Sequence, residues 1–173
     1  ALARATGDVV CLMVESDLQS LCIERVDGDY PIRNLTVDVG LRKPLHYGAA
    51  SFALLSFLPE EKIERILSQP LDAPTPYTIV DPDTIRARIQ EVRRLGYAVS
   101  DQDSVEHTAA VGAPIFGYQG EVVAALSAGG PKHRYPPERI PEVAALVMST
   151  AAEISRRLGY VSQPAGGARE PTP

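Results

Sequence analysis

The segment over about 45–58 constrains the fold most, because it is apolar on nearly every side of a helix. Small and bulky apolar residues fill it, among them Ala49, Phe52 and Leu55. A helix with one apolar stripe can lie on a protein surface, whereas one that is apolar all round must be enclosed by other elements. We therefore expect a core helix that is buried rather than packed on one side alone.

Apolar runs elsewhere in the chain predict strands. The runs 9–14 and 21–26 are apolar and partly β-branched, and a polar turn at 15–17 lies between them, which predicts a β-hairpin. Further strands are expected at 35–39, 97–99, 108–116 and 121–127, the last two joined by a glycine-containing turn at 117–120.

Three more helices complete the prediction. Pro59 ends the apolar helix and begins a charged one over 60–67. Asp81 and Pro82 are an N-cap and a first helical residue, so a helix is expected from there to Leu95, with Gly96 as its C-cap. A last helix is expected over about 137–158. Because the strand connections are of hairpin length, the predicted fold class is α+β, an antiparallel sheet flanked by helices.

Composition limits the functions that are open to this chain. Its 173 residues, with 45% hydrophobic and 23% charged, suit one globular domain over 1–160, and the tail over 161–173, rich in Pro, Gly and Ala, is expected to be disordered. The net charge is −5 and no basic block is present, so the chain is not expected to bind nucleic acid by itself. No run is long enough to span a bilayer and no secretory signal begins the chain, which predicts a cytoplasmic protein without a membrane partner.

Two cysteines lie in the predicted hairpin. A symmetric register about its turn places Cys11 opposite Cys22, so either a cross-strand disulfide or two reduced buried thiols would fit. A cytosolic chain favours the reduced thiols. Thiols within apolar strands are poor nucleophiles, because burial raises the thiol pKa.

The sequence indicates no catalytic residue, cofactor or metal. His46 has no nucleophile or orienting acid beside it in the sequence, so a structural or pocket-lining role is favoured over catalysis. His107 and His133 lie in polar contexts, and no set of residues has metal-ligand spacing. The acidic stretch 101–106 lacks the ligand spacing of a calcium-binding loop, so a solvated turn is expected there.

One local feature points towards a ligand. The buried helix starts with the small residues Gly48, Ala49 and Ala50. Helix N-termini carry unpaired N–H groups and partial positive charge, which attract carboxylates and phosphates, and small side chains let a ligand approach the backbone closely. The alternative is that these residues merely allow tight packing of the helix on the sheet.

Several short segments, in order and suitably spaced, together resemble the effector-binding domain of IclR-type bacterial transcription regulators. The matching segments are 40–46 (GLRKPLH), 58–61 (LPEE), 77–79 (YTI), 93–98 (RRLGYA), 113–116 (APIF), 122–127 (VVAALS), 130–131 (GP) and 151–159 (AAEISRRLG). The resemblance implies a GAF-like domain that senses a small metabolite, often an organic acid, and assembles as dimers or tetramers. It also implies that DNA is bound only through an N-terminal winged helix-turn-helix, which this chain does not contain.

The resemblance also implies an effector site. Carried over position by position, its residues are His46, Tyr47, Gly48, Ala49, Ala50, Ser100, Asp101, Ala110, Ser127 and Gly129. Two of them depart from the polar residues common in the family: a cysteine position is Ala110 and a serine-type position is Gly129. Other departures add aromatic mass near the expected site, at Tyr47, Phe52 and His107.

All of these departures make the expected site less polar or more aromatic. A small polar acid would lose hydrogen bonds at the shortened side chains, at a cost of about 1–3 kcal/mol each. We therefore expect an effector larger or more apolar than a two- or three-carbon acid, for instance an aromatic or alkyl acid. Two other functions remain open: a GAF-like thiol enzyme, which would need a reactive thiol in its pocket, and an oligomerisation module without an effector.

Overall fold

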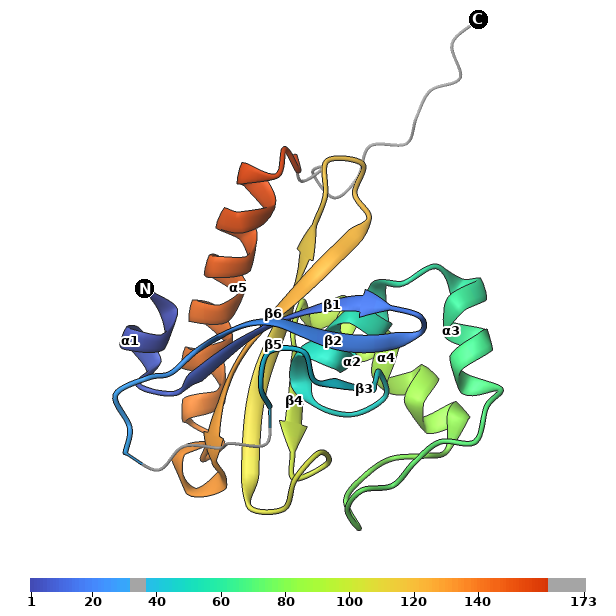
Figure 1. Ribbon diagram of the computed structural model, residues 1–173, viewed down its shortest axis with the longest axis horizontal. Coiled ribbons are helices and arrows are strands. Elements are labelled where there is room, and N and C mark those ends of the chain that lie inside the picture. Colours follow the sequence, from blue (N-terminus) through green and yellow to red (C-terminus); the bar gives the residue numbers. More distant parts are fainter. Residues whose placement is uncertain (32–36, 162–173) are drawn as a thin grey trace, which may run out of the picture.

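The computed structural model describes residues 1–31 and 37–161. Its centre is one antiparallel sheet in the order β3-β2-β1-β6-β5-β4, with helices on both faces (Figure 1). The strands are β1 (Val9–Ser16), β2 (Gln19–Val26), β3 (Arg42–Pro44), β4 (Ala98–Asp101), β5 (Thr108–Phe116) and β6 (Val122–Pro131). The helices are α1 (Leu2–Thr6), α2 (Ala49–Phe57), α3 (Glu60–Leu67), α4 (Pro82–Leu95), the 3₁₀ turn η1 (Lys132–Arg134) and α5 (Arg139–Arg157).

Two hairpins build the middle of the sheet and confirm the predicted α+β class. The turn of the first hairpin places Asp17 and Leu18 at φ values of 54° and 62°, the left-handed pair that a two-residue hairpin turn requires. The second hairpin joins β5 to β6. Antiparallel pairing of β1 with β6 then brings the first and last strands of the chain side by side.

Each face of the sheet carries its own core. α5 packs on β5 and β6, and its Val143, Val147 and Ala151 are buried there. The other face is covered by α2, which lies between the sheet and α4. Phe52, Leu54 and Leu55 of α2 are fully buried, so the prediction of an all-round buried helix is confirmed.

Most predicted elements are present, with shifted ends. α2 begins at Ala49 instead of Leu45, because the chain from Leu45 to Gly48 makes a turn before it enters the helix. The predicted strand 35–39 is wrong over residues 37–39, which form no strand, and its first two residues lie outside the described ranges. The predicted tail also lies outside them, apart from Val161. None of the helices in the described ranges is long and apolar enough to cross a membrane.

The expected pairing of the two cysteines is wrong. A register shift between Leu12 and Met13 places Met13 opposite Cys22, whereas Cys11 faces Arg25. A bulge of this kind adds one residue to a strand, and the sequence carries no signal for it. Both thiols are free and buried.

Candidate functional site

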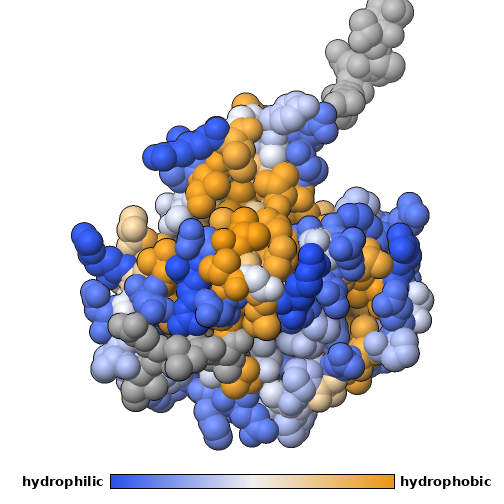
Figure 2. All heavy atoms as spheres, in the orientation of Figure 1, coloured by the Kyte–Doolittle hydropathy of each residue, from blue (hydrophilic) through white to orange (hydrophobic). Residues whose placement is uncertain are grey.

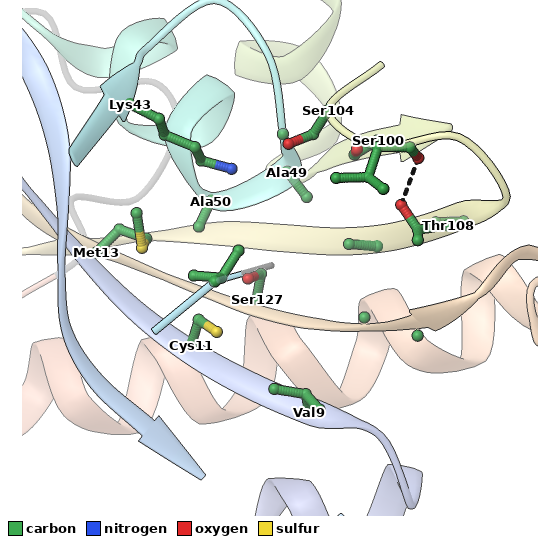
Figure 3. A pocket seen from close by; sticks show the side chains of 17 residues that line it. Val9, Cys11, Met13, Lys43, Ala49, Ala50, Ser100, Ser104, Thr108 and Ser127 are labelled. Atoms are coloured by element: carbon green, nitrogen blue, oxygen red, sulfur yellow. Dashed lines mark hydrogen bonds between the residues drawn. The ribbon is translucent and has the colours of Figure 1, made fainter. Parts of the chain in front are cut away.

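A hollow lies between the sheet and the first turn of α2 (Figure 3). It encloses about 590 Å³ of space, counting the part of its mouth that is open to solvent. The neighbouring strands β5 and β6 form its floor and β1 forms a wall, while β3 and the loop after β4 supply its rim. We call this hollow the α2 cavity.

Small residues on the two neighbouring strands β5 and β6 make the floor of the α2 cavity. Gly112 of β5 pairs with Ser127 of β6, and Ala110 pairs with Gly129. A side chain at Gly112 would come within 2.6 Å of the Ala49 carbonyl carbon, so the start of α2 rests directly on the strand there. A side chain at Gly129 would meet the Cβ of Ala110 at 2.7 Å. The sheet therefore has almost no side-chain bulk beside the helix start, and this leaves the hollow open.

The N-terminus of α2 faces the cavity with unpaired backbone groups. Its N-cap is Gly48, at a φ of 80°, which supplies no capping side chain. The N–H of Gly48 donates to Asp103 Oδ1 at 3.2 Å. Within the part of the chain that the structure describes, the N–H groups of Ala49 and Ala50 have no acceptor. These two N–H groups and the helix dipole form an anion-attracting end that opens into a pocket.

Asp103, which anchors this helix end, was missed in the sequence. The acidic stretch 101–106 was expected to be a solvated turn, but the Asp103 side chain is buried and accepts hydrogen bonds from Ser100 and from Arg88, at 3.3 Å from Nη1. A signal was available in α4. Arg88 lies beside the apolar stripe of Ile85 and Val92, and a charge at the edge of a buried face needs a buried partner.

The structure brings most of the expected effector residues to one place. Those that line the α2 cavity are Gly48, Ala49, Ala50, Ser100, Ala110, Ser127 and Gly129. Three others do not line it: His46, Tyr47 and Asp101. The expected aromatic additions at Phe52 and His107 do not line it either.

The residues outside the cavity have other partners. His46 is buried, and its Nε2–H donates to the Asp72 carbonyl at 2.8 Å, while its Nδ1 has no partner among the described residues. Tyr47 stacks edge-on against His46, with 4.9 Å between ring centroids. Asp101 is exposed and pairs with Lys132. His46 therefore packs under the loop after α3, because the turn before α2 points it away from the helix end.

The wall formed by β1 was missed as well. Val9, Cys11 and Met13 line the cavity, because alternate residues of this strand face α2. Cys11 is thus a pocket-facing thiol. Burial raises its pKa to about 12, and the nearby Cys22 adds to the effect. A thiol with such a pKa is almost entirely protonated at neutral pH and is a weak nucleophile.

Within residues 1–31 and 37–161, one charged side chain lines the cavity, that of Lys43 on β3. Sequence reasoning missed it, because the strand β3 was not predicted. Figure 3 shows its ammonium reaching towards the start of α2. No group of three or more His, Cys, Asp and Glu side chains within residues 1–31 and 37–161 could hold a metal ion.

The fold and the chain's sequence together define its class. The arrangement of six strands with helices on both faces is shared by the C-terminal domains of bacterial transcription regulators of known structure. The family model described as "Bacterial transcriptional regulator IclR C-terminal" matches residues 1–156. The chain therefore belongs to the IclR family of bacterial transcriptional regulators and corresponds to its C-terminal domain.

Relatives and solved structures agree with this assignment. The chain is 34% identical to the HTH-type transcriptional regulator KipR of Bacillus subtilis and 32% identical to the HTH-type transcriptional repressor AllR of Escherichia coli K12. The matches cover 92% and 94% of this chain but only 64% and 60% of those proteins. Thermotoga maritima IclR superposes with a TM-score of 0.87 at 30% identity, covering 92% of this chain and 64% of that one. The C-terminal domain of E. coli KdgR gives 0.81 at 26% identity, with 92% of both chains covered. These names describe regulators and repressors of transcription, which are not enzymes.

Proposed function

We propose that this domain senses a small organic effector in the α2 cavity and thereby modulates DNA binding by a helix-turn-helix part of the same regulator. The relatives KipR and AllR are named HTH-type and exceed this chain in length, which leaves room for such a part. Effector binding would favour one arrangement of the subunits over another, so it requires different affinities for the two arrangements. Such a regulator acts in the bacterial cytoplasm, where its DNA lies.

The observation that carries the proposal is the unpaired start of α2 at the bottom of a pocket. The N–H groups of Ala49 and Ala50 find no acceptor among the described residues, and the residues around them are too small to cover them. A carboxylate is the simplest ligand that satisfies both N–H groups and the helix dipole. The effector class proposed is therefore a carboxylate-bearing organic molecule.

The remaining walls favour an effector with an apolar body. Ala110 and Gly129 offer no hydroxyl or thiol, and Val9 and Met13 add apolar surface from β1. The aromatic side chains expected near the site are elsewhere, so this preference rests on the β1 wall and on the two shortened positions. The polar side chains of the lining are the hydroxyls of Ser100, Ser104, Thr108 and Ser127, which carry no charge. An alkyl or aromatic acid larger than three carbons matches this surface better than glyoxylate or pyruvate does.

Thermal unfolding of the chain with a panel of acids tests the proposal. Butyrate, hexanoate and benzoate should each raise the midpoint, and a ligand at one hundred times its Kd should add about 2.7 kcal/mol of stability. Glyoxylate and pyruvate at equal concentration should raise it less. If no acid shifts the midpoint, the domain has only an oligomerisation role, and if glyoxylate binds most tightly the proposed apolar body is wrong.

We also propose that the domain associates with further copies of itself as a dimer or tetramer. Apolar side chains gather on the face shown in Figure 2, over the upper half of β6 and the adjoining side of α5. Apolar patches of this kind on soluble proteins mark interaction surfaces. Sedimentation equilibrium measures the mass directly, and a monomer at high micromolar concentration would contradict this part of the proposal.

A further inference from the structure

Lys43 occupies an unusual position for a lysine on an edge strand. Its side chain leaves β3 and crosses the mouth of the α2 cavity (Figure 3). Its Nζ lies 2.4 Å from the point where a Cβ would stand on Gly48. Only glycine leaves space for the ammonium there, and the φ of 80° at Gly48 independently favours glycine. The ammonium is therefore held directly in front of the first turn of α2.

The Lys43 ammonium has no anion to bind within the described ranges. No carboxylate lies within 4.0 Å of it, and no hydrogen bond from it is formed there. Asp103 is near enough to act electrostatically, but its two oxygens are already used by Gly48, Ser100 and Arg88. The face of the Tyr47 ring, 5.8 Å from Nζ, is its other contact.

Lys43 is half-buried as a whole, and its ammonium is the more enclosed part of the side chain. Burial lowers the pKa of Lys43, and the negative charge of Asp103 opposes that shift only in part. A buried charge without a partner is unfavourable, and native proteins keep such charges where an ion or ligand completes the pairing. An anion that enters the cavity would supply such a partner for Lys43.

Two independent features thus lie at one point: an unpaired cation and the two unpaired N–H groups of Ala49 and Ala50. We propose that Lys43 binds the effector's carboxylate together with these N–H groups, and that the effector carries a single negative charge on an otherwise apolar body. This inference rests on the proposed function and assigns it a charge-selecting residue.

The restriction to one charge follows from the rest of the lining. Among the described residues that line the cavity, Lys43 is the one with a charged side chain. The opposite wall consists of Val9, Cys11 and Met13, which cannot stabilise a second anionic group. A second carboxylate would meet either these apolar side chains or the uncharged hydroxyls of the lining serines and Thr108, and no second cation, which disfavours a dicarboxylate relative to a monocarboxylate of the same length.

Paired acids and amides test the role of Lys43 in the 173-residue chain. The probes are hexanoate with hexanamide and benzoate with benzamide, measured by calorimetry and by thermal unfolding. Wild type should bind the acids and discriminate against the amides. Lys43→Met, which keeps the length and removes the charge, should weaken acid binding about ten- to hundredfold and leave the amides unaffected. Lys43→Arg should restore much of the affinity, and Lys132→Met, at an exposed ion pair, should change nothing.

A measurement without ligand separates this role from a structural one. If the ammonium has no partner until an anionic effector binds, Lys43→Met should unfold at the same temperature as wild type or a few degrees higher, since an unpaired buried charge has been removed. A midpoint lowered by several degrees would overturn the inference and assign Lys43 to the stability of the fold. Equal binding of hexanoate to wild type and Lys43→Met would overturn it too, as would tighter binding of adipate than of hexanoate. If wild type binds no acid at all, the proposed function fails together with the inference.

Discussion

The contact between α2 and the sheet depends on a single glycine. Gly112 lies under the first residue of the helix, and a Cβ there would stand 2.6 Å from the Ala49 carbonyl carbon and 2.7 Å from the Ala50 nitrogen. Its φ is not in the left-handed region, so space and not backbone conformation requires glycine. The neighbouring atoms are backbone and cannot rotate away. Any side chain must push the helix start off the strand and displace the N–H groups that face the cavity.

Gly112→Ala should therefore lower the free energy of unfolding by about 1–3 kcal/mol, the usual cost of overpacking a filled core. Urea denaturation measures this. Gly117→Ala is the matched control, because the Cβ there meets the carboxylate of Glu121, which can rotate away. An unchanged midpoint for Gly112→Ala would show that α2 does not rest on β5 at this position.

Sequence reasoning reached some residues of the site and missed others for a physical reason. Gly48, Ala49 and Ala50 were recognisable, because a run of small residues at a helix start has a local meaning. No local sequence pattern marks Lys43 or Asp103, because each residue gains its role from an element that is distant in the chain. Lys43 faces α2 only because β3 pairs with β2, and Asp103 is buried only because Arg88 meets it from α4.

Among the elements, α3 is tied to the first hairpin by a partly buried ion pair. Lys62 of α3 donates to Glu15 Oε2 at 2.5 Å, and the N–H of Leu18 donates to Glu15 Oε1 at 2.9 Å. Partial burial of the Glu15 carboxyl raises its pKa, but the hydrogen bonds from Lys62 and Leu18 outweigh this, so the pKa is lowered overall. A carboxyl whose pKa is lower in the folded state stabilises the fold above its unfolded pKa of about 4.3, and that contribution disappears as the pH falls through the folded pKa.

Glu15→Gln should thus reduce stability by about 1 kcal/mol at pH 7. The difference from wild type should shrink as the pH falls from about 5 towards 3, because wild type then loses the same ion pair. Chemical denaturation at several pH values measures both effects. Glu64→Gln, at an exposed pair with Arg86, is the control and should have a smaller effect at pH 7. A difference between wild type and Glu15→Gln that stays constant with pH would contradict the assignment.

The element boundaries show which parts of the fold are encoded locally. α4 begins and ends as predicted, since Asp81 caps it through the Thr84 N–H at 2.8 Å and Gly96 ends it in the left-handed conformation. The bulge in β2 and the short strand β3 were not predicted, because both depend on the partner strand. Pattern and capping residues therefore predict the type of most elements, whereas register depends on tertiary pairing.

Across the whole molecule, Asp8 holds the two ends of the domain together. Its side chain is 1% exposed and accepts hydrogen bonds from Arg134 Nε at 2.6 Å, Arg139 Nη2 at 2.8 Å and the Tyr135 hydroxyl at 3.1 Å. Both arginines also donate to the Thr6 carbonyl at the end of α1. This cluster joins α1 and β1 to η1 and α5, which are more than 120 residues away along the chain. No local pattern could have predicted it.

The Asp8 cluster also adjoins the α2 cavity. Val9, the next residue, lines the cavity and pairs with Gly129, and a side chain at Gly130 would come within 3.0 Å of Asp8 Oδ1. The start of β1 and the end of β6 therefore line part of the cavity, and they also adjoin the Asp8 cluster that holds α1. A disturbance at Asp8 should spread to α1 and to the cavity floor together.

Asp8→Ala should be strongly destabilising, because it leaves two arginine side chains without their buried partner. Removing one member of a buried ion pair costs about 3–5 kcal/mol, whereas Asp101→Ala, which breaks an exposed pair with Lys132, should cost about 1 kcal/mol or less. Denaturation gives these values, and hydrogen exchange locates the loss. We expect faster exchange in α1, at the start of β1 and at the end of β6, with the hairpin turn at Asp17 unaffected. If α1 alone exchanged faster, the cluster would anchor that helix only, and the cavity floor would be held by the sheet itself.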